Sequence, residues 1–288
     1  MDKIIKLTDL NYIYSPGTPF EWQALKNINI EIEKGEFLGI IGHTGSGKST
    51  LISHLNGILK PTTGKILIDG EDIWNLKDKK NIRFKVGLVF QYPEYQLFEE
   101  TIYKDIAFGP YNMGLSKEEV HERVLYSLKF VGLDESILEK SPFEISGGQK
   151  RRVAIAGVIA MKPQILILDE PTAGLDPRGR DEILMNIKEY HKAEGRTVIL
   201  VSHSMEDIAK TVNKVLVMNK SEVFMFDTVA KIFERASELY DVGLAIPQIT
   251  RIFLDLKNKG YDVDTSIFNI EDALKEIERA KKAVANNA

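Results

Sequence analysis

The sequence predicts an α/β fold built around a parallel β-sheet that helices cover on both faces. Residues 37–41, 165–168 and 198–201 are almost continuous runs of apolar side chains. Parallel strands that are buried on both faces have this pattern, whereas half-exposed strands alternate. The first run leads into the glycine-rich segment GHTGSGKS, and residues 49–59 are expected to form the helix that follows it. A strand, a glycine loop and a helix in this order are typical of phosphate-binding folds.

Four further segments are expected to be strands. Residues 4–10 and 26–33 alternate apolar and polar side chains, which predicts two half-buried strands. Residues 65–68 and 86–90 are shorter apolar runs between polar segments, and they are interpreted as strands as well.

A mostly helical insert is expected over roughly residues 95–160. Ser116 can cap a helix, because Glu119 follows three residues later. Apolar side chains then recur at helical spacing, at Val120, Val124, Leu128 and Val131.

The residues after about 228 are interpreted as a C-terminal appendix, residues 229–288. One apolar helical face stops at Gly260, and a second begins after Asn269, which can serve as its cap. The side chains of these faces are Ile249, Ile252, Phe253 and Leu256, and then Ile270, Leu274 and Ile277. Two short helices bury little by themselves, so they are expected to pack on the main domain or on another subunit.

Composition excludes several functional classes. The chain has 288 residues, 43% of them hydrophobic and 28% charged, with a formal net charge of -4, so bulk charge gives no argument for nucleic-acid binding. It has no cysteine, which excludes disulfides and thiol chemistry. The N-terminal residues lack the apolar region of a signal peptide, and the longest apolar stretch, residues 153–161, is far shorter than a bilayer span of about 20 residues. A membrane role is therefore expected to depend on partners.

The glycine-rich segment is a Walker A loop in the required strand–loop–helix context. Its backbone N–H groups and the following helix N-terminus can bind phosphate oxygens. Lys48 is expected to reach the β- and γ-phosphates, and Ser49 to hold Mg²⁺. The predicted nucleotide-binding residues of this segment are Gly42, His43, Thr44, Gly45, Ser46, Gly47, Lys48, Ser49 and Thr50.

Adjacent carboxylates end the second apolar run. Asp169 can orient Mg²⁺ through water, and Glu170 can act as the general base for the attacking water. Solvated acids at a strand end are the alternative, but PTAGLD follows directly and makes this alternative less favourable. Two other polar residues follow predicted strands: Gln91 can contact Mg²⁺ or the attacking water, and His203 can hydrogen-bond the γ-phosphate. Each of these two, taken alone, is better explained as a polar strand terminus.

These motifs, with ISGGQ at residues 145–149 between them, resemble the ATP-binding subunits of ABC transporters over roughly residues 4–225. The resemblance implies a P-loop NTPase fold of the ABC type in residues 1–228: a RecA-like core, an antiparallel β subdomain and a helical signature subdomain. ATP and Mg²⁺ are the implied cofactors, with the roles given above for Lys48, Gln91, Glu170 and His203. It also implies that Tyr14 stacks on adenine. Packing between strands is the alternative for Tyr14, since Tyr12 alternates with it.

In that family the signature usually begins with Leu, and Ile145 is a near-isosteric replacement. The resemblance implies that Ser146, Gly147, Gly148 and Gln149 bind the γ-phosphate held by the Walker A loop of a facing subunit. Asp176 is expected to reach across the same interface. The hydrolytic unit would then be a head-to-tail dimer with two ATP molecules between the chains.

A narrower resemblance is to the ATPases of energy-coupling factor vitamin importers, above all the second of their two non-identical ATPases. It rests on QYPEYQLFEETIYKDIAFGPYNMGL, SGGQKRRVAIAGVIAMKP, the YSPGTPFEWQAL insert and the C-terminal appendix. This resemblance implies a paired second ATPase, a membrane coupling subunit, exchangeable substrate-binding membrane subunits, and a peripheral location on the cytoplasmic face of the membrane. The appendix is expected to take part in dimerisation. Residues 92–98 suit a groove for a partner's helix; a buried turn between subdomains is the alternative.

Two other functions compete with this one. A homodimeric ATPase of a cobalt or nickel importer would have the same chemistry and different partners. A soluble ABC ATPase that acts on DNA or ribosomes is less favoured. The segment between the Walker motifs is too short for a long coiled coil, and the chain has a single cassette.

Overall fold

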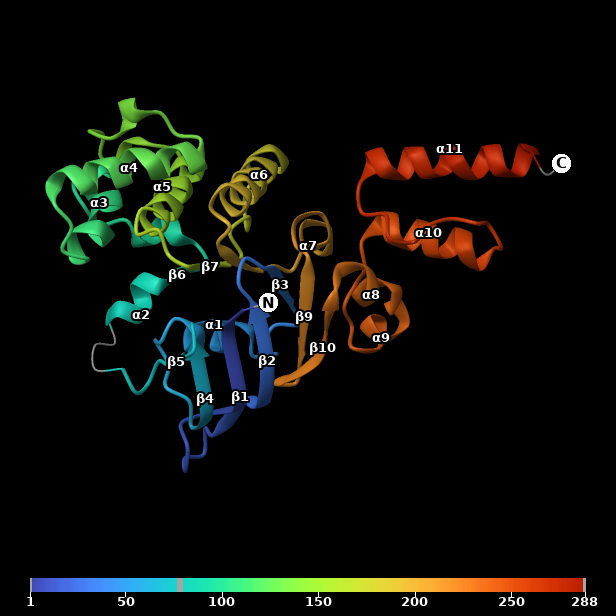
Figure 1. Ribbon diagram of the computed structural model, residues 1–288, viewed down its shortest axis with the longest axis horizontal. Helices are drawn as coiled ribbons and strands as arrows, with labels where there is room; N and C mark the ends of the chain where they lie inside the picture. The colour runs from blue at the N-terminus through green and yellow to red at the C-terminus, as the bar shows by residue number, and fades with distance from the viewer. Residues whose placement is uncertain (1, 77–79, 287–288) are drawn as a thin grey trace.

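The computed structural model describes residues 2–76 and 80–286, which form two β-sheets with helices around them (Figure 1). The smaller sheet has the order β2-β1-β4-β5 and is antiparallel. The larger sheet has the order β10-β9-β3-β8-β7-β6, and all its strands except β10 are parallel. The strands of the smaller sheet are β1 (Lys3–Tyr14), β2 (Trp22–Glu33), β4 (Thr63–Ile68) and β5 (Glu71–Asp72). Those of the larger are β3 (Phe37–Ile41), β6 (Val86–Val89), β7 (Ile165–Asp169), β8 (Thr197–Val201), β9 (Lys214–Asn219) and β10 (Glu222–Thr228).

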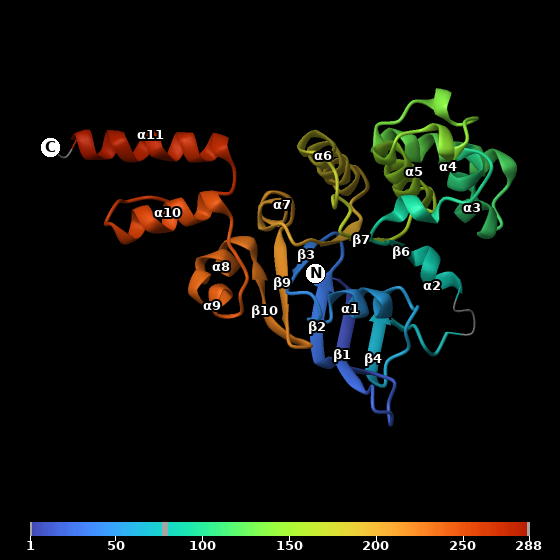
Figure 2. The same cartoon turned by 180° about the vertical axis from the view of Figure 1, so that it is seen from behind.

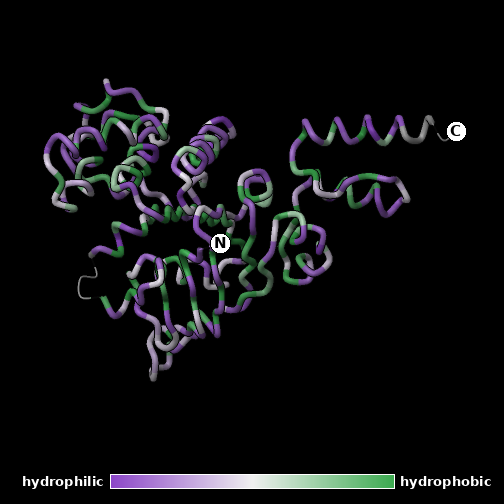
Figure 3. The backbone as a smooth tube through the Cα atoms, in the orientation of Figure 1, coloured by the Kyte–Doolittle hydropathy of each residue, from purple (hydrophilic) through white to green (hydrophobic). Residues whose placement is uncertain are grey.

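Helix α1 (Lys48–Leu55) lies between the two sheets, because Leu51, Ile52 and Leu55 join strands of both in one buried cluster. Successive side chains of a strand point to opposite faces. Accordingly, Ile165 and Ile167 of β7 belong to this cluster. The central strands are the most continuously hydrophobic part of the backbone (Figure 3).

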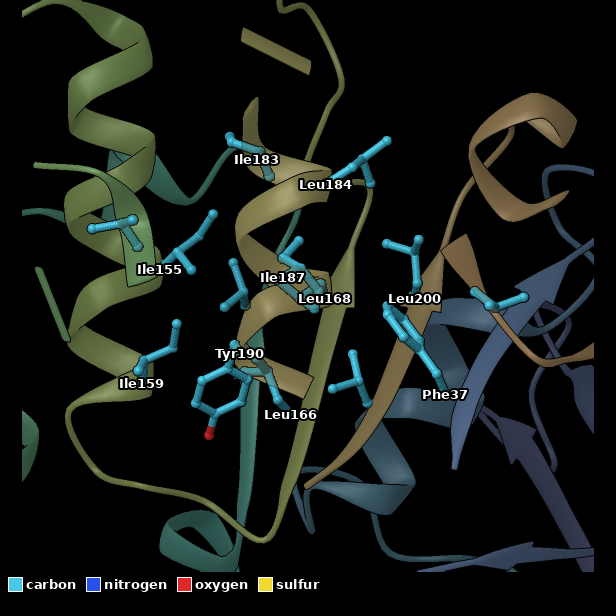
Figure 4. Packing of buried hydrophobic residues seen from close by; sticks show 14 of the residues in the cluster. Phe37, Ile155, Ile159, Leu166, Leu168, Ile183, Leu184, Ile187, Tyr190 and Leu200 are labelled. Carbon is cyan, nitrogen blue, oxygen red and sulfur yellow. The ribbon is translucent and has the colours of Figure 1, made fainter. Parts of the chain in front are cut away.

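The other face of the larger sheet is covered by helices (Figure 4). Leu166 and Leu168 of β7 pack there in one cluster with Ile155 and Ile159 of α5 and with Ile187 of α6. Helices α3, α4 and α5 also contact one another and form the helical region. The helices on this side are α3 (Ile102–Asn112), α4 (Lys117–Val131), α5 (Gly147–Ile159), α6 (Pro177–Glu194) and α7 (Met205–Thr211); α2 (Lys80–Lys85) precedes β6.

The α/β fold class is confirmed, and several local predictions hold in detail. Ser116 caps α4 in a full capping box with Glu119. The Asn269 side chain accepts a hydrogen bond from the Asp272 N–H at the start of α11. The predicted helix over 49–59 is too long, since α1 ends at Leu55. The Asn56 side chain donates to the Val86 carbonyl, and Gly57 turns left-handed, which ends the helix.

Several elements were not predicted from the sequence. Helix α6 has an amphipathic pattern that was overlooked, although Asp176, Pro177 and Gly195 mark its two ends. The hairpin of β9 and β10 follows α7, and its turn contacts β2 through a hydrogen bond from the Lys26 N–H to the Ser221 carbonyl. Helices α8 (Val229–Glu234) and α9 (Ala236–Asp241) were also missed.

The C-terminal residues pack in two different ways. Phe233, Leu239 and Ile246 are buried in the cluster that lies between the larger sheet and the helices that cover it. Helices α10 (Gln248–Asn258) and α11 (Ile270–Asn286) instead share a small cluster around Phe253. These two helices lie at the opposite end of the molecule from α3–α5 in both views (Figure 1 and Figure 2). The division at residue 228 stays a prediction. Within residues 2–76 and 80–286, no helix is long and apolar enough to cross a bilayer.

Candidate active site

A cavity of about 530 Å³ brings most of the predicted site residues together. Its lining comes from the β1–β2 hairpin, the glycine loop and the ends of β6, β7 and β8. The lining residues are Tyr14, Trp22, Thr44, Gly45, Gly47, Lys48, Ser49, Thr50, Gln91, Asp169, Glu170 and His203. A larger cavity of about 810 Å³ beside α2 contains none of the predicted site residues, so its size is no argument for catalysis.

The glycine loop is shaped by close backbone contacts. Gly47 has a φ of 104°, and a Cβ there would come within 2.5 Å of the Ala24 carbonyl oxygen. Gly42 has a φ of 150°, and a Cβ there would meet the Met218 carbonyl. Larger residues therefore cannot replace these two glycines without moving the loop. By contrast, Gly45 faces open space at the cavity.

Lys48 is buried at the base of the loop. Its ammonium donates to the carbonyl oxygens of Gly42, at 2.6 Å, and His43, at 2.9 Å. Burial lowers the pKa of Lys48, while Glu170 and Asp169 oppose that shift. A positive charge thus lies beside two carboxylates, where phosphate oxygens can replace the carbonyl contacts.

Asp169 and Glu170 lie at the carboxyl end of β7, and both side chains are largely buried. Burial raises the pKa of Asp169, against the Lys48 ammonium and a hydrogen bond from the Ser49 hydroxyl. Burial, followed by the neighbouring Asp169, raises the pKa of Glu170 to about 7. Glu170 also has a φ of 50°, a left-handed conformation that is uncommon outside glycine and marks a constrained position.

The Glu170 carboxylate is only partly used by the protein. It accepts a hydrogen bond from the His203 backbone N–H. Its Oε1 has no hydrogen-bond partner among the described residues and lies 3.7 Å from His203 Nε2. Burial and then the Lys48 charge lower the pKa of His203. A free carboxylate oxygen with a pKa near neutrality is suited to accept a proton from water.

The oxygen donors near the loop fit a magnesium ion. Ser49, Gln91 and Asp169 line one cavity and offer hydroxyl, amide and carboxylate oxygens, the ligands that Mg²⁺ prefers. Among the described residues, no group of three or more His, Cys, Asp and Glu side chains forms a metal cage. Mg²⁺ commonly uses one or two protein ligands together with substrate phosphates and water, so this donor set is sufficient.

Two aromatic rings form one wall of the cavity. The Tyr14 and Thr50 hydroxyl oxygens are 3.3 Å apart, which ties Tyr14 to helix α1. The Trp22 ring is parallel to that of Tyr14, with 6.1 Å between the ring centroids. Tyr14 also contacts Tyr12 edge to face, so it both packs in the hairpin and faces the cavity. Trp22 was missed, although the two residues are opposite each other in the β1–β2 register.

The signature residues are not part of this cavity. Ser146 and Gln149 form a capping box at the start of α5. The Gln149 N–H donates to Ser146 Oγ at 3.3 Å, and the Ser146 N–H donates to Gln149 Oε1 at 3.0 Å. A Cβ on Gly147 or Gly148 would meet nothing within 4 Å. Asp176 caps α6 by accepting from the Gly179 N–H at 2.7 Å. These residues do not line the cavity of their own chain, and their contact with a facing subunit stays a prediction.

Arg151 joins three segments that are distant in the sequence, and it was not predicted as a site residue. It is buried, and its guanidinium forms a two-pronged ion pair with Glu94 at 2.7 and 3.0 Å. It also donates to the carbonyl oxygens of Pro171 and Ala173. Arg151 therefore joins the signature helix to the turn after Gln91 and to the segment after Glu170. Its partners are distant in sequence, so no local pattern identifies it.

The segment 92–98 is partly a surface feature. Tyr95 and Phe98 are 84% and 65% exposed, whereas Pro93 in the turn η1 (Pro93–Gln96) is buried. Next to it lies a cavity of about 290 Å³ with a mostly apolar lining that includes Leu97, Phe108 and Met161. The Phe98 and Phe108 rings meet edge to face at 5.0 Å. An apolar groove with exposed aromatic rings is more than an ordinary buried turn requires.

Comparisons with known proteins agree with this geometry. The family model described as "ABC transporter" matches residues 25–173. Among curated proteins, the energy-coupling factor transporter ATP-binding protein EcfA2 of Clostridium perfringens is 59% identical over 93% of this chain and 95% of its own. EcfA2 of Clostridium acetobutylicum is 60% identical over 96% and 97%, respectively.

Two solved structures of ABC proteins are similar to this chain. CbiO1 from Clostridium perfringens, described as part of the ABC transporter complex cbiONQ, has a TM-score of 0.75 and 41% identity. It covers 89% of this chain and 100% of its own. The ATP-binding cassette MJ0796, a dimer in a post-hydrolysis state with ADP and Pi, has a TM-score of 0.69 and 31% identity, with coverage of 78% and 98%.

Proposed function

The chain belongs to the ABC transporter family as an energy-coupling factor ATP-binding subunit, and we propose that its ATPase drives the uptake of vitamins or other micronutrients. The observation that carries the ATPase part of this proposal is the single cavity shared by Lys48, the Asp169–Glu170 pair and His203. It combines a phosphate-binding loop, oxygen ligands and a candidate base. The relatives named as energy-coupling factor transporter ATP-binding proteins support the coupling of this chemistry to transport.

In this proposal the glycine loop and Lys48 bind the β- and γ-phosphates, and Tyr14 stacks on adenine. Ser49 and Gln91 would hold Mg²⁺ directly, and Asp169 would orient it through water. The bound ion would neutralise charge on the phosphate oxygens. The Ser49 hydroxyl already donates to Asp169, which keeps the two oxygen donors together.

Glu170 is the proposed general base. Its free Oε1 would take a proton from the attacking water, and the pKa of about 7 suits proton transfer near neutral pH. His203 would hydrogen-bond the γ-phosphate, since Nε2 lies at the same end of the cavity as Glu170 Oε1. The lowered pKa of His203 favours the neutral ring, which can donate one hydrogen bond and accept another.

The proposed hydrolytic unit is a dimer in which the signature of each chain completes the site of the other. Ser146, Gly147 and Gly148 are at a helix N-terminus and face open space, which suits an anion that arrives from outside the chain. The proposed partner is a second, non-identical ATPase. The appendix would add to this dimer, because Ile252, Ile270 and Leu274 are exposed apolar side chains.

The proposed membrane contact is the apolar groove beside residues 92–98. A helix of the membrane coupling subunit would bind there, next to Gln91 at the nucleotide cavity. Substrate-binding membrane subunits would join through that coupling subunit. The chain would then be a peripheral protein on the cytoplasmic face of the membrane.

A homodimeric ATPase of a cobalt or nickel importer is the second candidate. CbiO1, at 41% identity, is described as part of the ABC transporter complex cbiONQ, so assembly into a complex other than the one proposed is the alternative. Mass spectrometry of the detergent-solubilised native complex would distinguish the two. A second ATPase with a membrane coupling protein would support the main proposal, and two copies of this chain would support the alternative. Ribosomal or DNA-bound partners would contradict both.

A further inference from the structure

The Walker A loop touches the C-terminal part of the chain through His43. Its Nε2 lies 2.5 Å from the carbonyl oxygen of Val242, 199 residues away in the sequence. A carbonyl oxygen only accepts hydrogen bonds, so His43 is the donor in this contact. Val242 follows the last residue of α9, where helix carbonyls lack partners within the helix. The side chain of His43, from the nucleotide loop, therefore donates a hydrogen bond to the C-terminal end of α9.

Gly243 brings the backbone against the same ring. It has a φ of 70°, and a Cβ there would lie 2.9 Å from His43 Nε2 and 3.3 Å from Cε1. An L side chain would thus meet both backbone strain and the imidazole. The histidine and the glycine fit together as one contact between loop and appendix.

A second contact joins the residues after Gly243 to the loop that carries His203. The Gln248 N–H, at the first residue of α10, donates to Glu206 Oε1 at 3.4 Å. Glu206 is in the first turn of α7, three residues after His203. Between the two contacts, Leu244 and Ile246 are buried in the main core. Residues 242–248 therefore connect two phosphate-facing loops to the start of α10.

We propose that residues 242–248 couple the nucleotide site to the position of α10 and α11, with His43 as the positioning residue. This inference rests on the proposed nucleotide role of the loop. Occupation of the loop changes the backbone that carries His43, and the Val242 carbonyl moves with the His43 ring. Coupling between two sites is reciprocal. If nucleotide changes the affinity of α10 and α11 for another subunit by some factor, binding of that subunit changes the affinity for nucleotide by the same factor. The appendix is then a regulator of its own ATP site as well as a contact surface.

The test compares two glycines of the appendix in the full-length chain. Gly243→Ala presses a methyl group on His43, whereas Gly260→Ala, at a φ of 90°, meets nothing within 4 Å. Both substitutions carry similar backbone strain, so the second is a matched control. Titration calorimetry with MgADP should show affinity reduced about 5-fold or more by Gly243→Ala, in the usual range of coupling, and unchanged by Gly260→Ala.

A double-mutant cycle identifies His43 as the link. On a His43→Ala background, Gly243→Ala should have no further effect on affinity, because its methyl group no longer meets the ring. Equal affinities for the two glycine variants, or a full effect of Gly243→Ala without His43, would overturn the inference. A wild-type chain that binds no MgADP would instead defeat the nucleotide assignment itself.

Hydrogen exchange provides a readout that does not depend on a folded glycine variant. Adding MgADP to the wild-type chain should change the amide exchange of residues 242–248, and His43→Ala should abolish that change. Exchange in these residues that is indifferent to MgADP in the wild type would also refute the coupling.

Discussion

The chain has two glycine–serine segments at helix N-termini, and they differ in how the protein surrounds them. In the Walker A loop, a Cβ on Gly42 or Gly47 would collide with backbone carbonyls, and Lys48 is buried below them. In the signature, Gly147 and Gly148 face open space. The first segment is fixed by its own chain. The second is a helix end whose glycines have no structural reason within the chain, which points to a ligand or partner from outside.

The largest effect is expected from Glu170→Gln. In the proposed dimer, Glu170 lies at the ATP site that the Walker A loop of one chain and the signature of the other would form together. The amide cannot accept a proton, so turnover should fall by about 10²–10⁴, the usual contribution of a general base. ATP binding should persist, and the unhydrolysed ATP should hold the dimer closed. Single-turnover kinetics and size-exclusion chromatography measure the two outcomes. Unchanged hydrolysis would remove Glu170 from the role of base.

Lys48→Ala removes the buried charge on the Walker side. Nucleotide affinity should fall by about 10–100-fold, since charge-assisted hydrogen bonds contribute roughly 1.5–3 kcal/mol. Lys34→Ala is the control, because Lys34 is an exposed lysine on the same domain. Normal MgATP binding by the Lys48 variant would defeat the assignment of the loop.

These two predictions rest on the residues that the sequence identified most reliably. The glycine loop, Asp169 and Glu170 form short contiguous motifs, so their chemistry can be inferred locally. Gln91 and His203 were singled out as polar residues that follow predicted strands, and they line the same cavity because the carboxyl ends of parallel strands meet at one edge of a sheet. The sequence therefore identified residues that share one cavity, while their roles stay predictions.

The features that were missed depend on contacts between distant segments. Trp22 lines the cavity because of the register of β1 and β2, and Arg151 pairs with Glu94 across 57 residues. His43 was predicted as part of the nucleotide loop, but its contact with Val242 was not. Such contacts depend on three-dimensional packing, which apolar periodicity in one segment does not encode.

Replacing Phe98 tests the groove that would carry movement of the dimer to the membrane. Phe98→Ser should weaken binding of the membrane coupling subunit by about 30-fold, as expected for an aromatic side chain at the centre of an interface. The serine variant of Phe20 is the control, because Phe20 is 83% exposed at the hairpin turn, outside the groove. MgATP binding and dimer formation should be normal in both. Retained transport by a Leu97→Ser, Phe98→Ser double variant would show that the groove does not bind the membrane coupling subunit.

Gly148→Ala tests the signature side directly. Its methyl group meets no atom of the chain within 4 Å, so MgADP affinity and folding stability should stay at wild-type values. If the facing ATP comes this close, turnover of the dimer should fall by about tenfold, comparable to one lost hydrogen bond of about 1.4 kcal/mol. Steady-state ATPase assays with both ATPases present measure this effect. Full turnover would make the open glycines incidental and would remove the contrast between the two segments.

The last comparison concerns pH and the environment of Glu170. The base must be deprotonated, so kcat/KM should rise about tenfold per pH unit below the pKa of about 7 and level off above it. The lowered pKa of His203 keeps its ring neutral near pH 7, where the curve levels off. The opposite sign applies to stability: between the ordinary glutamate pKa of 4.5 and about 7, the folded carboxyl holds its proton, whereas the unfolded one has lost it. The free energy of unfolding therefore decreases as pH rises through this window, and Glu170→Gln removes that decrease. Urea titrations of both proteins at pH 5 and pH 8 measure it, and equal pH dependence would show that burial does not perturb the Glu170 carboxyl.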